Sequence, residues 1–369
     1  MEPNLKERIF GLDVLRATAI IMVVSSHVLW IYPKSNAFIP TLFEFFGFWG
    51  VELFFVLSGF LIGSILYKTF INENFTLKSV FHFLKRRWFR TLPNYYLVLI
   101  LNILIAFFLG FSIENTGSYF LFLQNFASKS PAFFPESWSL SIEEYTYLLL
   151  PFSLFFVGLS KVKNKSKLFL LVIVALILVF WMNKFIYHSQ HKISNLSEWN
   201  LNLKSVLIYR IDAILFGVLA AWFSFNYSSI WKQFKGVFAL IGFAILFFLM
   251  FGLIPMNLTI EQNPFFWNVL YLPITSVAFA FLLPFFSEWK TYANPVLYPV
   301  ELISKISYSI YLLHYSIILQ LLKVFVDTTQ MSTTERHFFT LIYLTITFLL
   351  SYILYRFYEK PMMNLRDKQ

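Results

Sequence analysis

Ten long apolar stretches run through this sequence, and each is long enough to cross a lipid bilayer as a helix. A transmembrane helix needs about 20 predominantly apolar residues. The short alternating strands of a membrane β-barrel would give a different pattern. The sequence therefore predicts an all-α fold, a polytopic transmembrane helical bundle of about ten spans. These spans fall near 12–32, 46–67, 92–111, 138–159, 167–187, 205–225, 236–254, 265–286, 300–325 and 337–357.

The composition excludes a water-soluble fold. Hydrophobic residues make up 58% of the chain and charged residues 13%, whereas soluble domains have about 45–50% apolar and about 25% charged residues. The 48 Phe, 20 Tyr and 10 Trp are more large aromatic side chains than a soluble chain of 369 residues could bury. The sequence has no cysteine, which excludes disulfides, thiolate metal ligands and a cysteine nucleophile.

The distribution of basic residues predicts how the chain is oriented. Of the 29 Lys and Arg residues, 20 fall on the side that holds both termini, 7 on the other side and 2 within spans. Because Lys and Arg hold loops in the cytoplasm, both termini are predicted to be cytoplasmic. The net charge of +10 is then mostly topological, and no nucleic-acid partner is predicted. The first span has no small-residue cleavage site and is interpreted as an uncleaved anchor.

The loops are short, and the longest has roughly 25 residues. Residues 1–369 are therefore predicted to form a single integral-membrane domain with no soluble appendage.

Ionisable side chains at membrane depth are costly, which makes each of them a candidate functional group. The first span carries Asp13, Arg16 and His27. Arg16 and His27 are eleven residues apart, which is three helical turns plus about 20°, so they share a face about 16 Å apart. Histidine is suited to act as a general base near neutral pH. The alternative is a histidine that only packs between helices.

The second span carries Glu52 near its outer end, where it is either functional or simply reaches the membrane interface. On the same span Gly59 and Gly63 are spaced to let a neighbouring helix approach closely. The loop before the third span carries Arg87 and Arg90. Their spacing puts both guanidiniums on one helix face, where a pair suits phosphate oxygens. The alternative is a basic anchor that only sets topology.

The fourth span places Glu143 and Glu144 near its outer end. A carboxylate there is predicted to orient or balance the His27 imidazole, and Glu143 is also a candidate partner for Arg210 on the sixth span. Three further charged groups are interpreted as members of structural ion pairs within the bundle: Asp212, Lys305 and Glu359.

Taken in order, these motifs resemble those of the acyltransferase 3 family of membrane-bound acyltransferases. The resemblance covers nearly the whole chain. Tyr145-Thr146, Ser304 and Tyr315 depart from the usual pattern beside key residues. The matching segments are Asp13 to Arg16 with His27, Gly50–Leu61, Arg87–Arg90 with Pro93 and Tyr95, Trp138–Glu144 with Tyr147, Arg210–Asp212 with Gly217, Ser307–His314 and Tyr355–Pro361.

The resemblance implies a multi-pass enzyme of the bacterial inner membrane that moves an acyl group, usually acetyl from acetyl-CoA, to a hydroxyl of a surface or exported glycan. It implies no metal. The implied partners are membrane lipid, acyl-CoA and a glycan acceptor. On this interpretation His27 is the general base, helped by Glu143 and Arg16, and Arg87, Arg90 and Arg16 hold the phosphates and arm of CoA. Contacts with substrate are expected from Asp13, Glu52, Ser139, Arg210, Tyr308 and His314.

Three other functions compete with this interpretation. A transporter or flippase for a glycan or lipid intermediate would line its path with the same buried charges. Another class of membrane acyltransferase would act on lipids or proteins, but its catalytic histidine usually lies deep in a longer chain. A purely structural assembly protein would have little use for so many charges within the membrane. The sequence does not identify the acyl group, the acceptor or the oligomeric state.

Overall fold

The computed structural model describes residues 8–35, 37–72, 74–113, 115–129, 132–160, 162–191, 195–290 and 297–366, and within these ranges the chain forms helices and no β-strand. The α-helices, in chain order, are α1 (Phe10–Val28), α2 (Phe38–Asn72), α3 (Leu77–Leu109), α4 (Gly117–Phe120), α5 (Trp138–Gly158), α6 (Lys165–Gln190), α7 (Leu196–Trp199), α8 (Ile211–Asn226), α9 (Ser228–Gln233), α10 (Lys235–Phe251), α11 (Leu272–Ser287), α12 (Tyr298–Leu313), α13 (Gln320–Phe325), α14 (Thr333–Leu354) and α15 (Lys360–Leu365).

Short helical segments of other types join or extend these helices. Three are 3₁₀ turns, at Leu29–Ile31, Pro135–Ser137 and Leu207–Tyr209. Four are π-helical, at Asn200–Lys204, Phe266–Tyr271, His314–Leu319 and Tyr355–Glu359. Such π segments are rare and often occur at functional sites.

The prediction of a polytopic helical membrane protein is confirmed. Within the described residues, eight helical segments are long and apolar enough to cross a membrane. The predicted spans at 205–225 and 236–254 correspond to α8 and α10, which are shorter, with 16 and 17 residues. The count of ten spans therefore stays a prediction.

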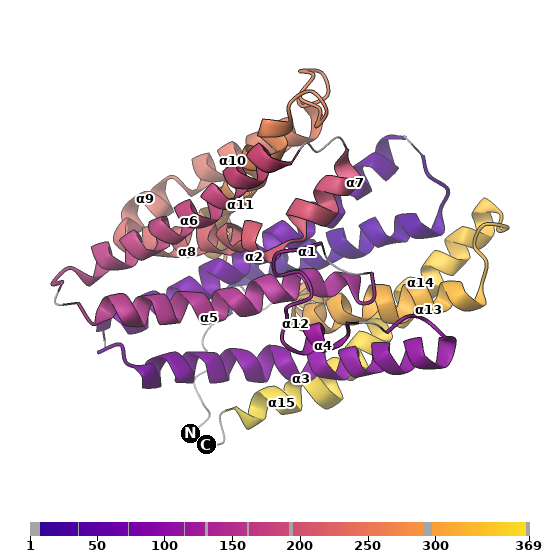
Figure 1. The fold of residues 1–369 in the computed structure, drawn as a ribbon, viewed down its shortest axis with the longest axis horizontal. Helices are drawn as coiled ribbons and strands as arrows, with labels where there is room; N and C mark the ends of the chain where they lie inside the picture. The colour runs from indigo at the N-terminus through magenta and orange to yellow at the C-terminus, as the bar shows by residue number, and fades with distance from the viewer. Residues whose placement is uncertain are drawn as a thin grey trace.

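Helix α2 lies at the centre of the bundle, against α1 on one side and α8 on the other (Figure 1). Glycines allow both contacts. A Cβ added to Gly59 would lie 1.9 Å from the carbonyl oxygen of Ile214 on α8, and one added to Gly217 would lie 2.0 Å from that of Val56 on α2. A Cβ on Gly50 would come within 2.6 Å of the Ala19 carbonyl oxygen on α1. The close helix approach predicted for this face of α2 is confirmed.

Two groups of helices pack around α1 and α2. The first group contains α3, α5, α12 and α14, and the second contains α8, α10 and α11 (Figure 1). Each group borders its own buried apolar cluster. Helices α1, α2 and α8 contribute side chains to both clusters, and α6 contributes mainly to the first. Residues of α1 and α2 therefore meet the functional side chains of the first group at the middle of the molecule.

Two predicted loops are helical in the structure. Helix α2 begins at Phe38, within the loop predicted at 33–45, and its 35 residues extend about 52 Å at about 1.5 Å per residue. Helix α3 begins at Leu77, where the Thr76 side chain caps the first turn together with Ser79. Arg87 and Arg90 thus lie within a continuous helix and not in a loop. Cap hydrogen bonds explain this early start despite the basic sequence.

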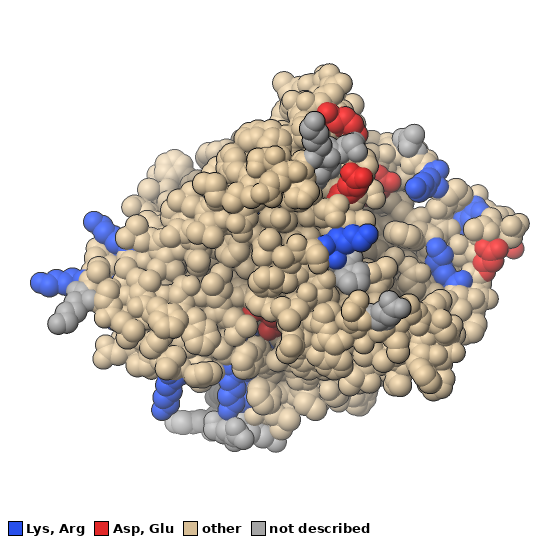
Figure 2. All heavy atoms as spheres, in the orientation of Figure 1, with Lys and Arg blue, Asp and Glu red and all other residues tan. Residues whose placement is uncertain are grey.

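Charged side chains are unevenly spread over the surface of the molecule. On the face shown in Figure 2, most of the surface is uncharged, basic groups lie at the left end and along the lower edge, and groups of both signs lie at the top and toward the right. This pattern agrees with the predicted basic side, although the orientation in a membrane stays a prediction. Lys6, Lys161, Lys192 and Lys368, which were counted for that prediction, lie outside the described residues.

Candidate active site

A cavity with a volume of about 780 Å³, including open solvent, lies among α1, α2, α3, α5 and α12. Its polar lining brings together six of the residues that the sequence analysis singled out, from four different helices. Val51, Phe54 and Phe55 of α2 form much of its apolar wall. These six residues, which the sequence analysis singled out, are Arg16, Arg87, Arg90, Ser139, Glu143 and Tyr308.

Arg87 and Arg90 also line a second cavity, toward the end of the bundle where α2 ends and α3 begins. This second cavity has a volume of about 1550 Å³, including open solvent, and Lys78, Arg86 and Arg366 also line it. In the part of the chain that the structure describes, neither Arg87 nor Arg90 has a carboxylate within 4.0 Å. The two guanidiniums therefore present positive charge to both cavities.

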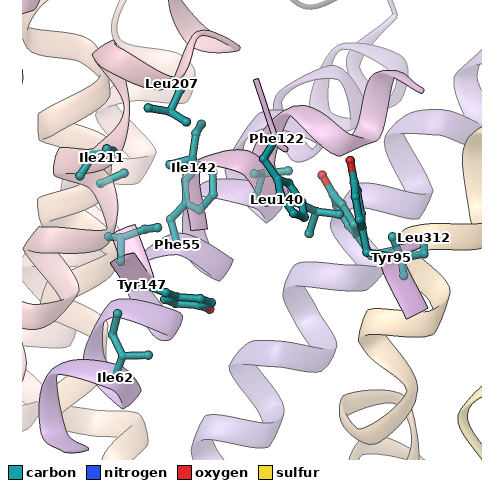
Figure 3. Close-up of a cluster of buried hydrophobic side chains, with 14 of the residues drawn as sticks. Phe55, Ile62, Tyr95, Phe122, Leu140, Ile142, Tyr147, Leu207, Ile211 and Leu312 are labelled. Atoms are coloured by element: carbon teal, nitrogen blue, oxygen red, sulfur yellow. The ribbon is translucent and has the colours of Figure 1, made fainter. Parts of the chain in front are cut away.

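The Arg87 guanidinium is held by aromatic rings. Its central carbon lies 5.7 Å from the ring centroid of Phe83 and 5.9 Å from that of Tyr147. Figure 3 shows Tyr147 between Phe55 and Ile62 in the apolar cluster beside the cavity. Cation–π contacts of this kind position a charge and leave its N–H donors available.

Glu143 and Glu144 have different surroundings. Glu143 lines the cavity, where the Tyr147 hydroxyl donates to it at 3.3 Å, and Tyr147 in turn shares a 2.9 Å hydrogen bond with Ser58. Glu144 is buried on another face of α5 and accepts a 2.6 Å hydrogen bond from Thr91 of α3. The sequence placed the arginines at the cytoplasmic mouth and Glu143 at the outer end, but the structure puts them around one cavity.

Arg16 reaches the cavity from α1 beside a small ionic cluster. Asp13 accepts two hydrogen bonds from Arg8, at 2.7 and 2.5 Å, and one of 2.6 Å from the Ser304 hydroxyl on α12. Arg16 lies 3.6 Å from the same carboxylate. Asp13, predicted to contact substrate, is thus occupied with protein groups. Ser304, a departure from the family pattern, supplies one of its hydrogen bonds.

His27 lies outside the cavity lining and pairs with a second histidine. Its Nδ1 is 3.2 Å from Nε2 of His314 and 3.0 Å from the Val23 carbonyl oxygen. The Tyr315 ring covers another side, with 4.5 Å between centroids. Glu143, predicted to orient His27, has no contact with it among the described residues. His314, predicted to contact substrate, is fully buried against His27.

Ser139 and Tyr311 separate the cavity from this histidine pair. Their hydroxyls share a 2.6 Å hydrogen bond, and Tyr311 also donates to the Glu136 carbonyl oxygen at 3.0 Å. Both residues line the cavity, and the Tyr311 ring lies 5.8 Å from that of His314. The arginines and the histidines therefore lie on opposite sides of one hydrogen-bonded pair.

The predicted partner of Arg210 is wrong. Arg210 pairs with Glu52 and not with Glu143, and Ser276 of α11 donates a further hydrogen bond to Glu52. Arg210 and Glu52 are both fully buried, so Glu52 does not reach the interface, and both contact protein groups rather than a cavity. The predicted structural pairing of Asp212 is confirmed, because Lys184 of α6 neutralises it.

The other two predicted structural ion pairs differ in outcome. Lys305 pairs with Glu301 at 3.5 Å. Glu359 is buried and accepts hydrogen bonds from the neutral groups of Asn94 and Ser309, and within the described residues no Lys or Arg lies within 4.0 Å of it.

The sequence analysis assigned no role to two residues of this site. Glu136 accepts hydrogen bonds from both the backbone N–H and the hydroxyl of Ser316 and so ties the turn before α5 to the π-helix that follows α12. Tyr311 separates the cavity from the histidines. The spacing of Tyr311 and His314, three apart on a helix, was the available signal for a shared face, whereas Glu136 gave no signal because it precedes the predicted span.

Comparison with known proteins identifies the family. The acyltransferase domain family Acyl_transf_3 matches residues 9–356. The chain belongs to this acyltransferase family. The resemblance inferred from the motifs is therefore confirmed, and the cavity described above is a cavity of an acyltransferase 3 domain.

Curated relatives carry more specific names. The peptidoglycan O-acetyltransferase OatA of Listeria monocytogenes is 26% identical over 385 residues, which cover 95% of this chain and 55% of the relative. The O-acetyltransferase OatA of Staphylococcus aureus is also 26% identical, over 95% of this chain and 56% of the relative. The putative peptidoglycan O-acetyltransferase YrhL of Bacillus subtilis is 30% identical over 43% of this chain and 25% of the relative.

The chain thus spans about half the length of the OatA relatives, and the single-domain prediction stays a prediction. No solved structure matches the chain significantly. Within the described residues, no group of three or more His, Asp or Glu side chains could hold a metal ion; a metal-free reaction stays a prediction.

Proposed function

We propose that this chain is a membrane O-acetyltransferase that transfers an acetyl group from acetyl-CoA to a sugar hydroxyl of a cell-wall glycan. The observation that carries the proposal is the cavity in which Arg16, Arg87 and Arg90 face an apolar wall. Guanidiniums match phosphate oxygens in charge and geometry, and an apolar channel suits an acylated pantetheine arm. The relatives named peptidoglycan O-acetyltransferase support a peptidoglycan acceptor.

In this proposal the donor enters from the cytoplasm through the second, basic cavity. Arg87 and Arg90 line both cavities and bind the phosphates of CoA, while the arm extends beside Arg16 toward Ser139. The acceptor approaches from the outer side, where His27 lies. Transfer requires the thioester and the hydroxyl to meet near the Ser139–Tyr311 pair that now separates the two ends.

The proposed chemistry is direct acyl transfer with His27 as general base. As the acceptor oxygen attacks the thioester carbonyl carbon, its proton passes to His27. The carbon–sulfur bond then breaks, and the departing thiolate takes the proton from His27, which leaves an ester and free CoA. General base catalysis of this kind contributes about 10²- to 10⁴-fold. Hydroxyls at the inner end of the cavity, from Ser139 and Tyr311, are candidates to stabilise the oxyanion.

The test uses the purified full chain, acetyl-CoA and soluble peptidoglycan fragments, with CoA release and fragment mass as readouts. The wild-type chain is expected to add one acetyl mass to the fragments. His27→Ala is expected to remain folded and lose at least about 100-fold in rate. Acetyl transfer at the wild-type rate by this variant would remove His27 from the mechanism.

The donor site has its own variant. Arg87→Ala/Arg90→Ala is expected to weaken CoA binding, measured by isothermal titration, by about 10-fold or more, because two charge-assisted contacts are lost. Lys167→Ala is the matched control, since this exposed lysine begins α6 outside both cavities. Equal CoA affinity in the wild type and the double variant would return both arginines to a topological role. A wild-type chain that moves glycan across vesicles without acyl transfer would favour a transporter.

A further inference from the structure

The pairing of two histidines on different helices defines their protonation. His314 Nδ1 lies 2.8 Å from the carbonyl oxygen of Tyr311 and 3.1 Å from that of Ile310. A carbonyl oxygen only accepts hydrogen bonds, so Nδ1 of His314 must carry the proton. In the neutral ring Nε2 of His314 is then an acceptor.

The same reasoning applies to His27. Its Nδ1 lies 3.0 Å from the Val23 carbonyl oxygen, so this nitrogen also carries a proton. This Nδ1–H is shared between two acceptors, the Val23 carbonyl oxygen and Nε2 of His314, which lies 3.2 Å away. In the neutral ring Nε2 of His27 is therefore unprotonated and available as a base. All four contacts agree on this single assignment of the two rings.

We infer that His314 is a positioning residue that holds His27 in the tautomer with a free Nε2 and accepts its Nδ1–H throughout the reaction. This inference rests on the proposed function, in which His27 is the base. When His27 takes the acceptor proton on Nε2 and becomes an imidazolium, its Nδ1–H bond to neutral His314 becomes a charge-assisted bond and strengthens. His314 itself neither gains nor loses a proton.

The surroundings of His314 suit this role. The ring is fully buried at the point where α12 gives way to the π-helix His314–Leu319. Glu136 fixes that π-helix by accepting from the backbone N–H of Ser316 at 3.1 Å and from its hydroxyl at 2.6 Å. The Tyr315 ring packs on His27 at an interplanar angle of 47° and restricts its rotation. The structure thus gives His314 the function that the sequence analysis assigned to Glu143.

Nuclear magnetic resonance tests the tautomer without any activity measurement. In the full chain with ¹⁵N-labelled histidine, six histidines contribute signals, and His27→Gln identifies those of His27. We expect a protonated Nδ1 and an unprotonated Nε2 for His27 in the wild type, and a larger share of the other tautomer in His314→Ala, where the Val23 carbonyl oxygen is the acceptor that remains for Nδ1–H. A protonated Nε2 in neutral His27 of the wild type would overturn the inference.

Kinetics test the catalytic consequence. His314→Ala is expected to lower kcat about 10- to 100-fold, the value of one charge-assisted hydrogen bond, with little change in KM for acetyl-CoA. His314→Gln places an amide oxygen toward His27 and is expected to recover part of that loss. His337→Ala is the control. Its Nδ1 lies 2.7 Å from the Tyr32 hydroxyl, at a site away from His27.

A double-variant cycle separates positioning from a general structural effect. If His314 acts through His27, His27→Ala/His314→Ala is no slower than His27→Ala. Losses that multiply in the double variant, or full activity of His314→Ala, would refute the role. A wild-type chain that transfers no acetyl group would refute the proposed function instead, and the tautomer of His27 would still decide whether His314 positions it.

Discussion

Removing Arg210 tests whether this residue contacts substrate, as its motif implies, or stabilises the bundle. Arg210 and Glu52 are both fully buried and form an ion pair between α8 and α2. In Arg210→Met the apolar volume is largely kept, but the Glu52 carboxylate loses its ion-pair partner and, within the described residues, keeps the hydrogen bond from Ser276 as its one side-chain hydrogen bond. Removing one partner of a buried ion pair costs about 3–5 kcal/mol, because the other charge is left uncompensated.

The rest of the Arg210 environment predicts a cost in the upper half of that range when Glu52 is removed instead of Arg210. Among the described residues, Nε and Nη1 of Arg210 have no hydrogen-bond partner. The guanidinium lies between the rings of Phe48 and Phe55, with its central carbon 5.9 and 5.7 Å from their centroids. Glu52 is therefore its one anionic contact in the described structure, and Glu52→Gln is expected to cost at least as much as Arg210→Met. Cation–π contacts at such a desolvated site contribute about 2 kcal/mol or more, but they are present with and without Glu52.

The double variant Glu52→Gln/Arg210→Met removes both charges together. Replacing a buried ion pair by neutral groups is often neutral in stability, so the double variant is expected within about 1 kcal/mol of the wild type. Thermal unfolding in detergent, followed by size-exclusion chromatography, gives the order of stabilities. Lys305→Met is the control, because its partly exposed pair with Glu301 is worth about 0–1 kcal/mol.

Two results would refute this reasoning. Single variants as stable as Lys305→Met would mean that the buried pair contributes little. A double variant that recovers stability but not acetyl transfer would mean that Arg210 also contacts substrate. Recovery of both properties is the expected outcome.

Two further variants test the helix packing and the cavity. Gly59→Ala places a Cβ 1.9 Å from a backbone oxygen of α8, so α2 and α8 must separate. We expect this change to lower the free energy of unfolding by about 1–3 kcal/mol, measured by thermal unfolding. Gly236→Ala is the control, because its Cβ would meet nothing within 4 Å, and it is expected to be neutral or slightly stabilising. Glu143→Gln removes a negative charge from the cavity, so acetyl-CoA is expected to bind no more weakly. Glu144→Gln is expected to change binding little, because the Glu144 side chain is not part of the cavity lining and accepts a hydrogen bond from Thr91.

The positions of the helices followed from the sequence because hydropathy is a local property. A long apolar run must be helical in a bilayer, whatever its neighbours are. The start of α3 did not follow in the same way, because the basic residues from Lys85 to Arg90 resemble a solvated loop. The cap at Thr76 extends the helix through them and carries Arg87 and Arg90 into the bundle.

The site was predictable where it depended on one helix. The eleven-residue spacing of Arg16 and His27 and the three-residue spacing of Arg87 and Arg90 are properties of a single helix. The choice of partner between helices was not predictable, because it depends on rotation and depth. Glu143 and Glu52 are both acids on other spans of the bundle. The packing of α2 on α8 places Glu52 beside Arg210, and this packing could not be read from the sequence.

The basic side chains within the bundle divide into two groups by what surrounds them, and this division supports the proposed donor end. Arg210 and Lys184 are buried, and each has a carboxylate of the chain as partner. Arg87 and Arg90 line both cavities and have none within 4.0 Å among the described residues. A bundle that neutralises its structural cations yet leaves these two beside open space favours an anionic ligand there. In the proposed function the donor phosphates then lie in the cavity and the histidine pair lies outside it, with Ser139 and Tyr311 between them.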